Sequence, residues 1–292
     1  MTKDKIIIKL QGGLGNQMFQ YALGRHLSHI TKAALKLDIT SFKNDPKRDY
    51  NLNCFNLREF FATDEEIRWF KKYQRKPGKI WFLYNRLVAD ETKYVEERQF
   101  HFDQKILQLK PPVYLDGYWN TEKYFKDIEE AIRKEFTLKN SLSDYAKSLE
   151  AEIMGKEAVS IHVRRGDYVS DKHTNEWHGS CSIEYYNQAI QKIAEHVTNP
   201  HFFIFSDDPV WIKENIIPPF LTTYLSGNAK YPEEDMHLMS RCKHHIIANS
   251  SFSWWGTWLN PNKEKIVIAP KRWFQTPKMD TRDLLPDSWI KI

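Results

Sequence analysis

The stretch "SIHVRRGDYV", residues 160–169, joins an apolar strand-like run to two adjacent arginines. The same order returns at "HFFIFSDD" (201–208) and "HHIIANSS" (244–251), and helix-like segments lie between these runs. Strands that alternate with helices predict a parallel sheet covered by helices on both faces. The chain also opens with a strand, a helix and a strand, at "KDKIIIKL" (3–10), 18–31 and 33–39. The sequence therefore predicts an α/β protein with two Rossmann-like halves.

Length and composition agree with a chain of two soluble, globular domains. The 292 residues are 41% hydrophobic and 28% charged, which allows one large domain or two of average size. The halves meet somewhere around 140–157, and we place the domains at 1–150 and 151–292. The net charge of +5 suits a small anionic ligand, whereas the dense Lys/Arg stripes typical of nucleic-acid binding are missing.

The sequence also favours a cytoplasmic location. The apolar run near the start is too short for the core of a signal peptide, and no window approaches the ~20 apolar residues of a membrane span. The three cysteines, an odd number far apart in the chain, are typical of a reducing compartment. A peripheral contact with the cytoplasmic face of a membrane stays open.

Unusual polar residues follow four of the predicted strands. These segments are "QGGLGN", "RRGD", "SDD" and "NSS". In open α/β sheets, ligands bind just outside the carboxyl ends of the strands. The shared position predicts one site rather than four unrelated turns.

The glycine loop at 11–17 has three readings. Gly13 and Gly15 supply the first part of a dinucleotide fingerprint, and Asp38 ends the second strand, but Met18 occupies the third glycine position. A structural tight turn is the second reading. In the third, Asn16 and its neighbour Gln17 offer neutral donors and acceptors to sugar hydroxyls or a phosphate.

Arg164 and Arg165 are the strongest candidates for binding an anion. Arginine forks match phosphate oxygens in bidentate geometry, and Gly166 would let the backbone approach a ligand. The alternative is one surface arginine and one salt bridge to Asp167. Two acids at 207–208 could hold Mg²⁺, but an acid before Pro209 more simply caps a helix.

Two further segments carry both a structural and a functional reading. Three acids at 233–235 start a helix, where acids suit the helix dipole. Asn249, Ser250 and Ser251 start the next helix and form either a cap or an anion site. The tryptophans that follow, at 254, 255 and 258, favour a core rather than a stacking platform.

Taken together, "GGLGNQMFQYALG", "HVRRGDYV", "DMHLMSRC" and "IIANSSFSWWGTWL" resemble the α1,2-fucosyltransferases of glycosyltransferase family 11. "LDGYWNTEKYF" and "KIVIAPKRWF" also fit. The matches run in the right order from Gly12 to Phe274, whereas 41–110 carries little of the resemblance. It implies a GT-B-like fold, whose two parallel sheets face a central cleft, with GDP-fucose as donor, a β-galactoside glycan as acceptor and no metal.

The resemblance also implies roles for particular residues. Arg164 and Arg165 match the arginines that bind the donor phosphates, and His162 and Asp235 match positions near the guanosine. Ser250 and Ser251 match a phosphate-contacting region, to which we add Asn249. Asn16 lies where an asparagine faces the reacting centre in related enzymes, and we place Gly13 and Gly15 beside it.

One departure leaves the catalytic base open. Some related fucosyltransferases carry an acid ten residues past the motif histidine, where this chain has Lys172. Asp167 is our candidate, with Asp171 and Glu176 as alternatives. From GDP-β-L-fucose, a single displacement would invert the anomeric configuration. The rival functions are a non-catalytic nucleotide-sugar or glycan-binding module and a transferase for another nucleotide sugar.

Overall fold

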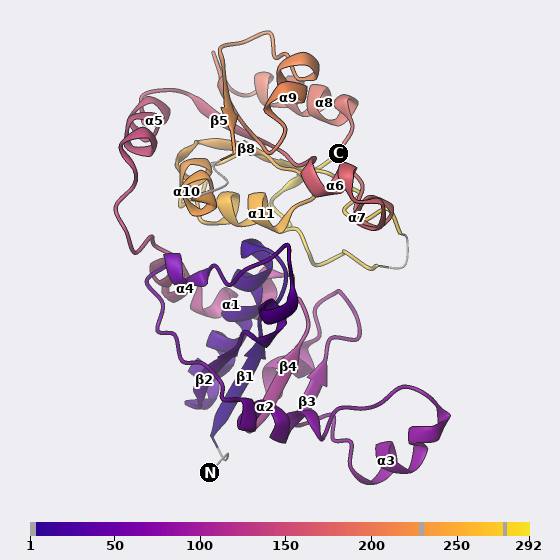
Figure 1. The fold of residues 1–292 in the computed structure, drawn as a ribbon. Coiled ribbons are helices and arrows are strands. Elements are labelled where there is room, and N and C mark those ends of the chain that lie inside the picture. The colour runs from indigo at the N-terminus through magenta and orange to yellow at the C-terminus, as the bar shows by residue number, and fades with distance from the viewer. Residues whose placement is uncertain (1–3, 228–230, 277–278) are drawn as a thin grey trace. The chain divides into compact units, whose positions relative to one another are not determined.

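The computed structural model describes residues 4–227, 231–276 and 279–292, without the side chains of Asp167 and His173. The chain forms two compact units (Figure 1). Unit 1 comprises Met1–Lys139 and Asp280–Leu284, and unit 2 comprises Asn140–Met279 and Leu285–Ile292. The boundary that we placed at residue 150 falls inside a helix of unit 2, α5 (Asp144–Met154).

Unit 1 is built on a four-stranded parallel sheet in the order β2-β1-β4-β3. Its strands are β1 (Lys5–Lys9), β2 (Ala34–Asp38), β3 (Tyr94–Glu96) and β4 (Val113–Asp116). Its α-helices are α1 (Leu14–Thr31), α2 (Asp64–Lys71), α3 (Phe82–Leu87) and α4 (Glu129–Glu135). The strand–helix–strand opening that the sequence predicts is confirmed.

Helices pack on both faces of the unit 1 sheet. Gly24 of α1 is so close to the sheet that an added Cβ would lie 2.7 Å from Leu35 Cδ1. On the other face, α2 buries Ile67 and Phe70 in a cluster with Ile7. Ile8 lies 3.2 Å from the same Cβ position, so the successive residues Ile7 and Ile8 of β1 face opposite sides of the sheet, as expected of a strand.

The segment Asp280–Leu284 completes unit 1 although it comes near the end of the chain. The Asp283 carboxylate accepts the backbone N–H of Phe102 at 3.0 Å and pairs with Lys123 Nζ at 2.5 Å. His101 lies 3.3 Å from the carboxylate of Asp280. The bonds of one short segment therefore fix two other parts of unit 1.

Unit 2 is built on a six-stranded parallel sheet in the order β10-β9-β8-β5-β6-β7. Its strands are β5 (Ala158–Val163), β6 (His201–Ser206), β7 (Thr222–Ser226), β8 (His244–Ile246), β9 (Val267–Ala269) and β10 (Ile290–Lys291). Besides α5, its helices are α6 (Gly166–Ser170), α7 (Lys172–Trp177), α8 (Ile183–Ala194), α9 (Pro209–Asn215), α10 (Pro232–Arg241) and α11 (Ser251–Trp258).

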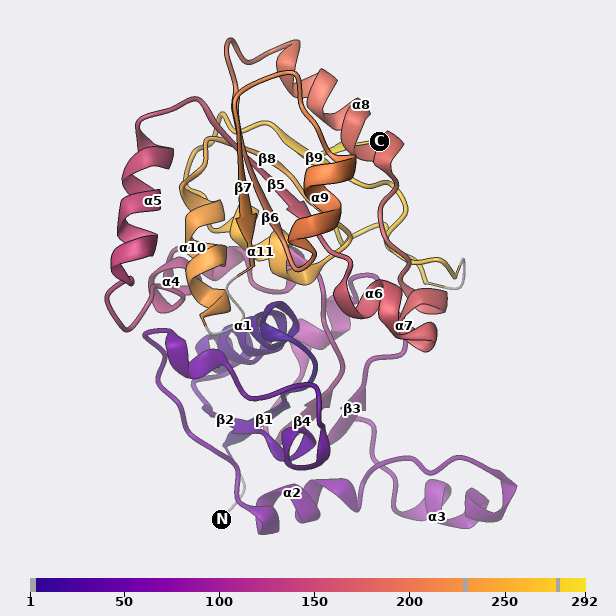
Figure 2. The same cartoon turned by 45° about the horizontal axis from the view of Figure 1, so that its top comes forward.

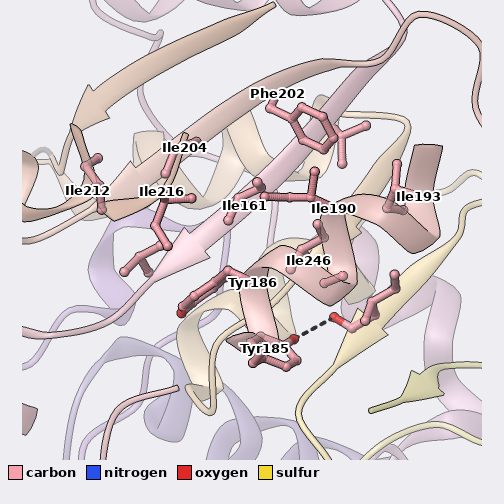
Figure 3. Close-up of a cluster of buried hydrophobic side chains, with 14 of the residues drawn as sticks. Ile161, Tyr185, Tyr186, Ile190, Ile193, Phe202, Ile204, Ile212, Ile216 and Ile246 are labelled. Carbon is pink, nitrogen blue, oxygen red and sulfur yellow. Dashed lines mark hydrogen bonds between the residues drawn. The ribbon is translucent and has the colours of Figure 1, made fainter. Parts of the chain in front are cut away.

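Two hydrophobic clusters show that this sheet is also covered on both faces. Ile161 and Ile204 pack with Ile190 of α8 and with residues of α9 (Figure 3). Phe203 and Phe205, the alternate residues of β6, pack with α5 and α10 instead. Figure 2 shows α8 and α9 on one side of the strands and α5 and α10 on the other. The α/β class with parallel sheets is confirmed.

Two segments contain short helices. The segment after "RRGD" forms α6 and α7, and a 3₁₀ turn (Lys79–Trp81) precedes α3. Trp254, Trp255 and Trp258 are buried, as expected of core residues. No helix within the described ranges combines the length and apolarity needed to cross a lipid bilayer.

Candidate active site

The strands of unit 2 end together at one edge of the sheet. Val163 of β5 pairs with Ser206 of β6, and Ile161 pairs with Ile246 of β8. The polar segments that follow these strands therefore start close to one another. The glycine loop lies at the corresponding end of β1 in unit 1.

The two arginines are fixed by the two acids that follow the neighbouring strand. Arg164 Nη1 lies 2.8 Å from Asp207 Oδ2, and the backbone N–H of Arg165 donates to Asp207 Oδ1 at 2.8 Å. Arg165 Nε lies 3.1 Å from Asp208 Oδ2, and its guanidinium sits 3.9 Å from the centre of the Trp211 ring. A carboxylate at the edge and a ring at the face hold the Arg165 fork in one orientation.

These contacts test the interpretation of the two acids and of Gly166. Asp208 Oδ1 accepts the backbone N–H of Trp211 at 3.1 Å, so the predicted helix cap, with Pro209 in the first turn, is confirmed. A Cβ on Gly166 would lie 2.7 Å from Asp207 Oδ2. A carboxylate of the protein thus makes the close approach that we expected of a ligand.

His162 lies directly beneath the arginines, in β5. The side chain is buried, its Nδ1 has no hydrogen-bond partner among the described residues, and its ring centroid lies 5.7 Å from that of Phe252. Burial lowers the pKa of His162 from 6.5 to about 4, an effect that Asp207 opposes and Arg164 reinforces. The ring is therefore neutral at pH 7.

Asn249 has a structural role at this edge. Its Nδ2 lies 3.1 Å, 2.9 Å and 3.1 Å from the carbonyl oxygens of His178, Gly179 and Trp273. Its own carbonyl accepts the Tyr168 hydroxyl at 3.2 Å. Asn249 therefore ties three distant segments together, and its amide hydrogens point at protein rather than at a ligand.

Ser250 and Ser251 begin α11. The Ser250 hydroxyl accepts the backbone N–H of Phe252 at 3.3 Å, which is the cap that the sequence predicts. Ser251 is half-buried in the first turn. A helix start carries backbone N–H groups and a positive dipole end, so the cap and an anion site are compatible here.

The three acids at the start of α10 have different environments. Glu234 is buried and accepts both the backbone N–H and the hydroxyl of Ser143, at 2.6 Å and 2.9 Å. Burial raises the pKa of Glu233. Asp235 is half-buried, and its Oδ2 lies 3.7 Å from the position of a Cβ on Gly227, which follows β7. Asp235 therefore lies at the carboxyl edge of the sheet.

In unit 1, the glycine loop is braced by its own polar side chains. Gln17 Nε2 donates to the carbonyls of Gly12 and Asp49 at 2.9 Å each, so this amide, which we expected to bind a ligand, holds the loop. Gly12 has φ +76°, and a Cβ there would lie 2.8 Å from Asn16 Nδ2. Asn16 is half-buried, and its Oδ1 accepts Asn120 Nδ2 at 3.3 Å.

The remaining glycines of the loop serve helix α1. Gly13 is its N-cap, and Gly15 is buried in its first turn. The close helix–strand packing that a dinucleotide fingerprint assigns to its third glycine is supplied by Gly24 instead. The sequence of the loop alone does not indicate that Gly24 has this packing role.

Glu97 is a candidate that the sequence analysis missed. Its carboxylate accepts the backbone N–H groups of Tyr118 and Trp119, at 2.7 Å and 3.0 Å. Burial raises the pKa of Glu97 to about 7, against the lowering effect of these two hydrogen bonds. The Tyr118 ring lies 3.5 Å from the position of a Cβ on Gly12, so Glu97 helps to build the surroundings of the glycine loop.

The candidates for the catalytic base are only partly described. The side chain of Asp167 lies outside the described residues, and its backbone belongs to α6. Asp171 caps α7 by accepting the backbone N–H of Thr174 at 2.8 Å. Glu176 is exposed and lies 4.0 Å from Lys172. Among the described residues, no cluster of three or more histidines, cysteines or acids is placed to hold a metal ion.

The chain is similar to proteins of known family. The model of "Glycosyl transferase family 11" matches residues 2–292. An α-1,2-colitosyltransferase of Escherichia coli is 37% identical over 98% of both chains, and the O-antigen biosynthesis glycosyltransferase WbnK of the same species is 33% identical over 97% of this chain and 99% of its own. A galactoside α-(1,2)-fucosyltransferase of Mus musculus is 29% identical over 57% of this chain and 45% of its own.

A solved structure supports the fold. The crystal structure of NodZ α-1,6-fucosyltransferase soaked with GDP-fucose is 14% identical, covers 89% of this chain and 93% of its own, and superposes with a TM-score of 0.50. The fold is thus GT-B-like, as in this fucosyltransferase. From its whole-length match, the chain belongs to glycosyl transferase family 11.

Proposed function

We propose that the chain is an inverting α1,2-fucosyltransferase, which moves L-fucose from GDP-β-L-fucose to the 2-hydroxyl of a terminal β-galactoside. The observation that carries the proposal is the fixed pair Arg164 and Arg165 at the carboxyl edge of the unit 2 sheet. Two relatives of this chain are named for α-1,2 transfer, one of colitose and one of fucose to a galactoside, which supports the linkage.

The arginines suit the departing diphosphate. A guanidinium carries five N–H groups in a planar fork, so Arg165 can bind Asp208 and a phosphate oxygen at the same time. Negative charge grows on the diphosphate as the sugar takes on oxocarbenium character. Donors already oriented by Asp207, Asp208 and Trp211 stabilise this charge without first having to be ordered.

The rest of the site follows the same logic. The start of α11 at Ser250 and Ser251 adds backbone N–H groups for the diphosphate. Asp235 and His162 suit the guanosine, because a carboxylate can accept both neighbouring N–H groups of guanine and a neutral ring avoids burying charge. Asp167 stays our proposed base, and Asn16 stays our proposed contact to the acceptor.

We also propose that no metal is needed. The carboxylates of Asp207 and Asp208, which are the acids best placed to attract Mg²⁺, already face the two arginines. The arginines can supply the positive charge that a divalent ion supplies in other transferases.

A donor carrying colitose is the second candidate. The observation in its favour is the 37% identity to the Escherichia coli colitosyltransferase. Colitose is L-fucose without its 3-hydroxyl group, so one contact to that hydroxyl would decide between the donors. The two GDP-sugars therefore form a matched pair for the assay.

The test is transfer by the purified chain from each GDP-sugar to lactose and to 2′-deoxylactose, which lacks the galactose 2-hydroxyl. We expect an α1,2-linked product from GDP-fucose and lactose, assigned by NMR, and no product from the deoxy acceptor. GDP-fucose that binds but is not transferred to any β-galactoside would indicate a binding module. Faster transfer of colitose would reassign the donor.

A further inference from the structure

The segment around α3 exposes an unusual group of large apolar side chains. Ile80, Phe82, Leu83 and Leu87 are between 64% and 88% exposed, and Trp81 and Val88 beside them are also exposed. We call these six residues the α3 patch. Single exposed apolar residues are normal on a protein surface, but a contiguous group of this kind marks an interaction site.

The α3 patch lies on a folded loop, residues 72–88, which we call the α3 excursion. Asn85 Oδ1 accepts the backbone N–H of Lys76 at 2.8 Å, and Asn85 Nδ2 donates to the Lys76 carbonyl at 2.7 Å. The Tyr84 hydroxyl donates to the carbonyl of Lys72. These bonds close the α3 excursion from within, and both Figure 1 and Figure 2 show α3 standing away from the unit 1 sheet.

The charged residues of the segment that carries the α3 patch are all positive. Residues 71–88 contain six lysines and arginines and no acid. Lys76 Nζ lies 4.1 Å from the centre of the Trp81 ring and 4.6 Å from that of Tyr84, which places a cation among the aromatic rings. Arg75 pairs at the base of the α3 excursion with Glu91, at 3.3 Å. The apolar side chains therefore lie in a segment whose own charges are all positive.

We propose that the α3 patch inserts into the headgroup region of a membrane that carries anionic lipids. Apolar and aromatic side chains flanked by lysine and arginine are the composition of segments that lie in a lipid interface. A second copy of this chain is a poor partner, because it would bring a second set of like charges to the contact. The proposal does not depend on which sugar the enzyme transfers.

The test is co-sedimentation with vesicles of phosphatidylcholine, alone or with 30% phosphatidylglycerol. We expect binding to the anionic vesicles at least about tenfold tighter than to the neutral ones, since each cation near the surface contributes about fivefold in affinity. Replacing both Phe82 and Leu83 by Ser should weaken binding at least about tenfold. Replacing both Lys79 and Arg86 by Gln should remove most of the preference for phosphatidylglycerol.

A matched control comes from unit 2. Ile217 and Leu221 are 69% and 70% exposed but lie outside the α3 patch, so replacing both by Ser should leave vesicle binding unchanged. Every variant should keep the wild-type circular dichroism spectrum and its turnover of a soluble acceptor. Equal loss of binding in the control, unchanged binding after the Phe82/Leu83 replacement, or a dimer that this replacement dissociates would overturn the proposal.

Discussion

Replacing His162 by Gln should make unit 2 less sensitive to acid. Burial lowers the pKa of His162 from 6.5 to about 4, so below pH 6.5 the unfolded chain binds a proton that the folded chain excludes. The wild type therefore loses stability as the pH falls from 6.5 towards 4, by up to about 1.4 kcal/mol per pH unit from this group. Between pH 7.5 and pH 5.0 the loss is about 2 kcal/mol, and the variant should not show it.

The measurement is amide hydrogen exchange of β5 (Ala158–Val163), which reports the opening of unit 2 separately. Comparing variant and wild type at the same pH cancels the intrinsic pH dependence of exchange. Phe252→Leu is the control, because it changes the ring beside His162 without removing a titrating group and should shift opening equally at both pH values. If the difference between His162→Gln and wild type is the same at pH 7.5 and 5.0, the ring titrates normally and our reasoning fails.

Four other predictions follow from the site. Arg165→Ala should stay folded and lose about 10²-fold in kcat with GDP-fucose; retained kcat would place the diphosphate elsewhere. Asp235→Asn should raise the KM for GDP-fucose about ten- to a hundredfold, because one acceptor for guanine becomes a donor, whereas Glu233→Gln should change it little; equal effects would remove Asp235 from guanine recognition. Activity should survive EDTA, and loss that Mg²⁺ or Mn²⁺ restores would refute metal independence. Burial raises the pKa of Glu97 to about 7. The contribution of Glu97 to the free energy of unfolding is therefore full below about pH 4.5 and is lost as the pH rises through 7. In urea unfolding, Glu97→Gln should make the free energy of unfolding depend less on pH over this range.

The fold was predictable wherever local patterns were long and regular. The strand-like run "SIHV" lies within β5 and ends with it at Val163, because the charged residues that follow leave little choice of boundary. The helices α6 and α7 were missed, since five or six residues are too few to display an apolar period. The strand β3 was not predicted for the same reason, since it has only three residues.

The site was predictable only in its residue types. The arginines stand out in the sequence, but their pairing with Asp207 and Asp208 depends on the alignment of β5 with β6, which no local pattern encodes. Glu97 accepts hydrogen bonds from backbone N–H groups more than twenty residues away. Every residue type except proline carries such a group, so the sequence does not show which one Glu97 contacts. The charge run at 71–88 is visible in the sequence, but its meaning depends on the exposure of the apolar residues within it.

The return of Asp280–Leu284 to unit 1 has a consequence for how the chain is made. Ribosomes add about 5–20 residues per second, so roughly 7–30 s separate the synthesis of Lys139 from that of Leu284. During this interval the amide of Phe102 and the ammonium of Lys123 lack the hydrogen bonds that the carboxylate of Asp283 later accepts from them. The unit whose synthesis starts first is thus completed only after residues 140–279 of unit 2 have been made, so its last contacts form late in the folding of the chain.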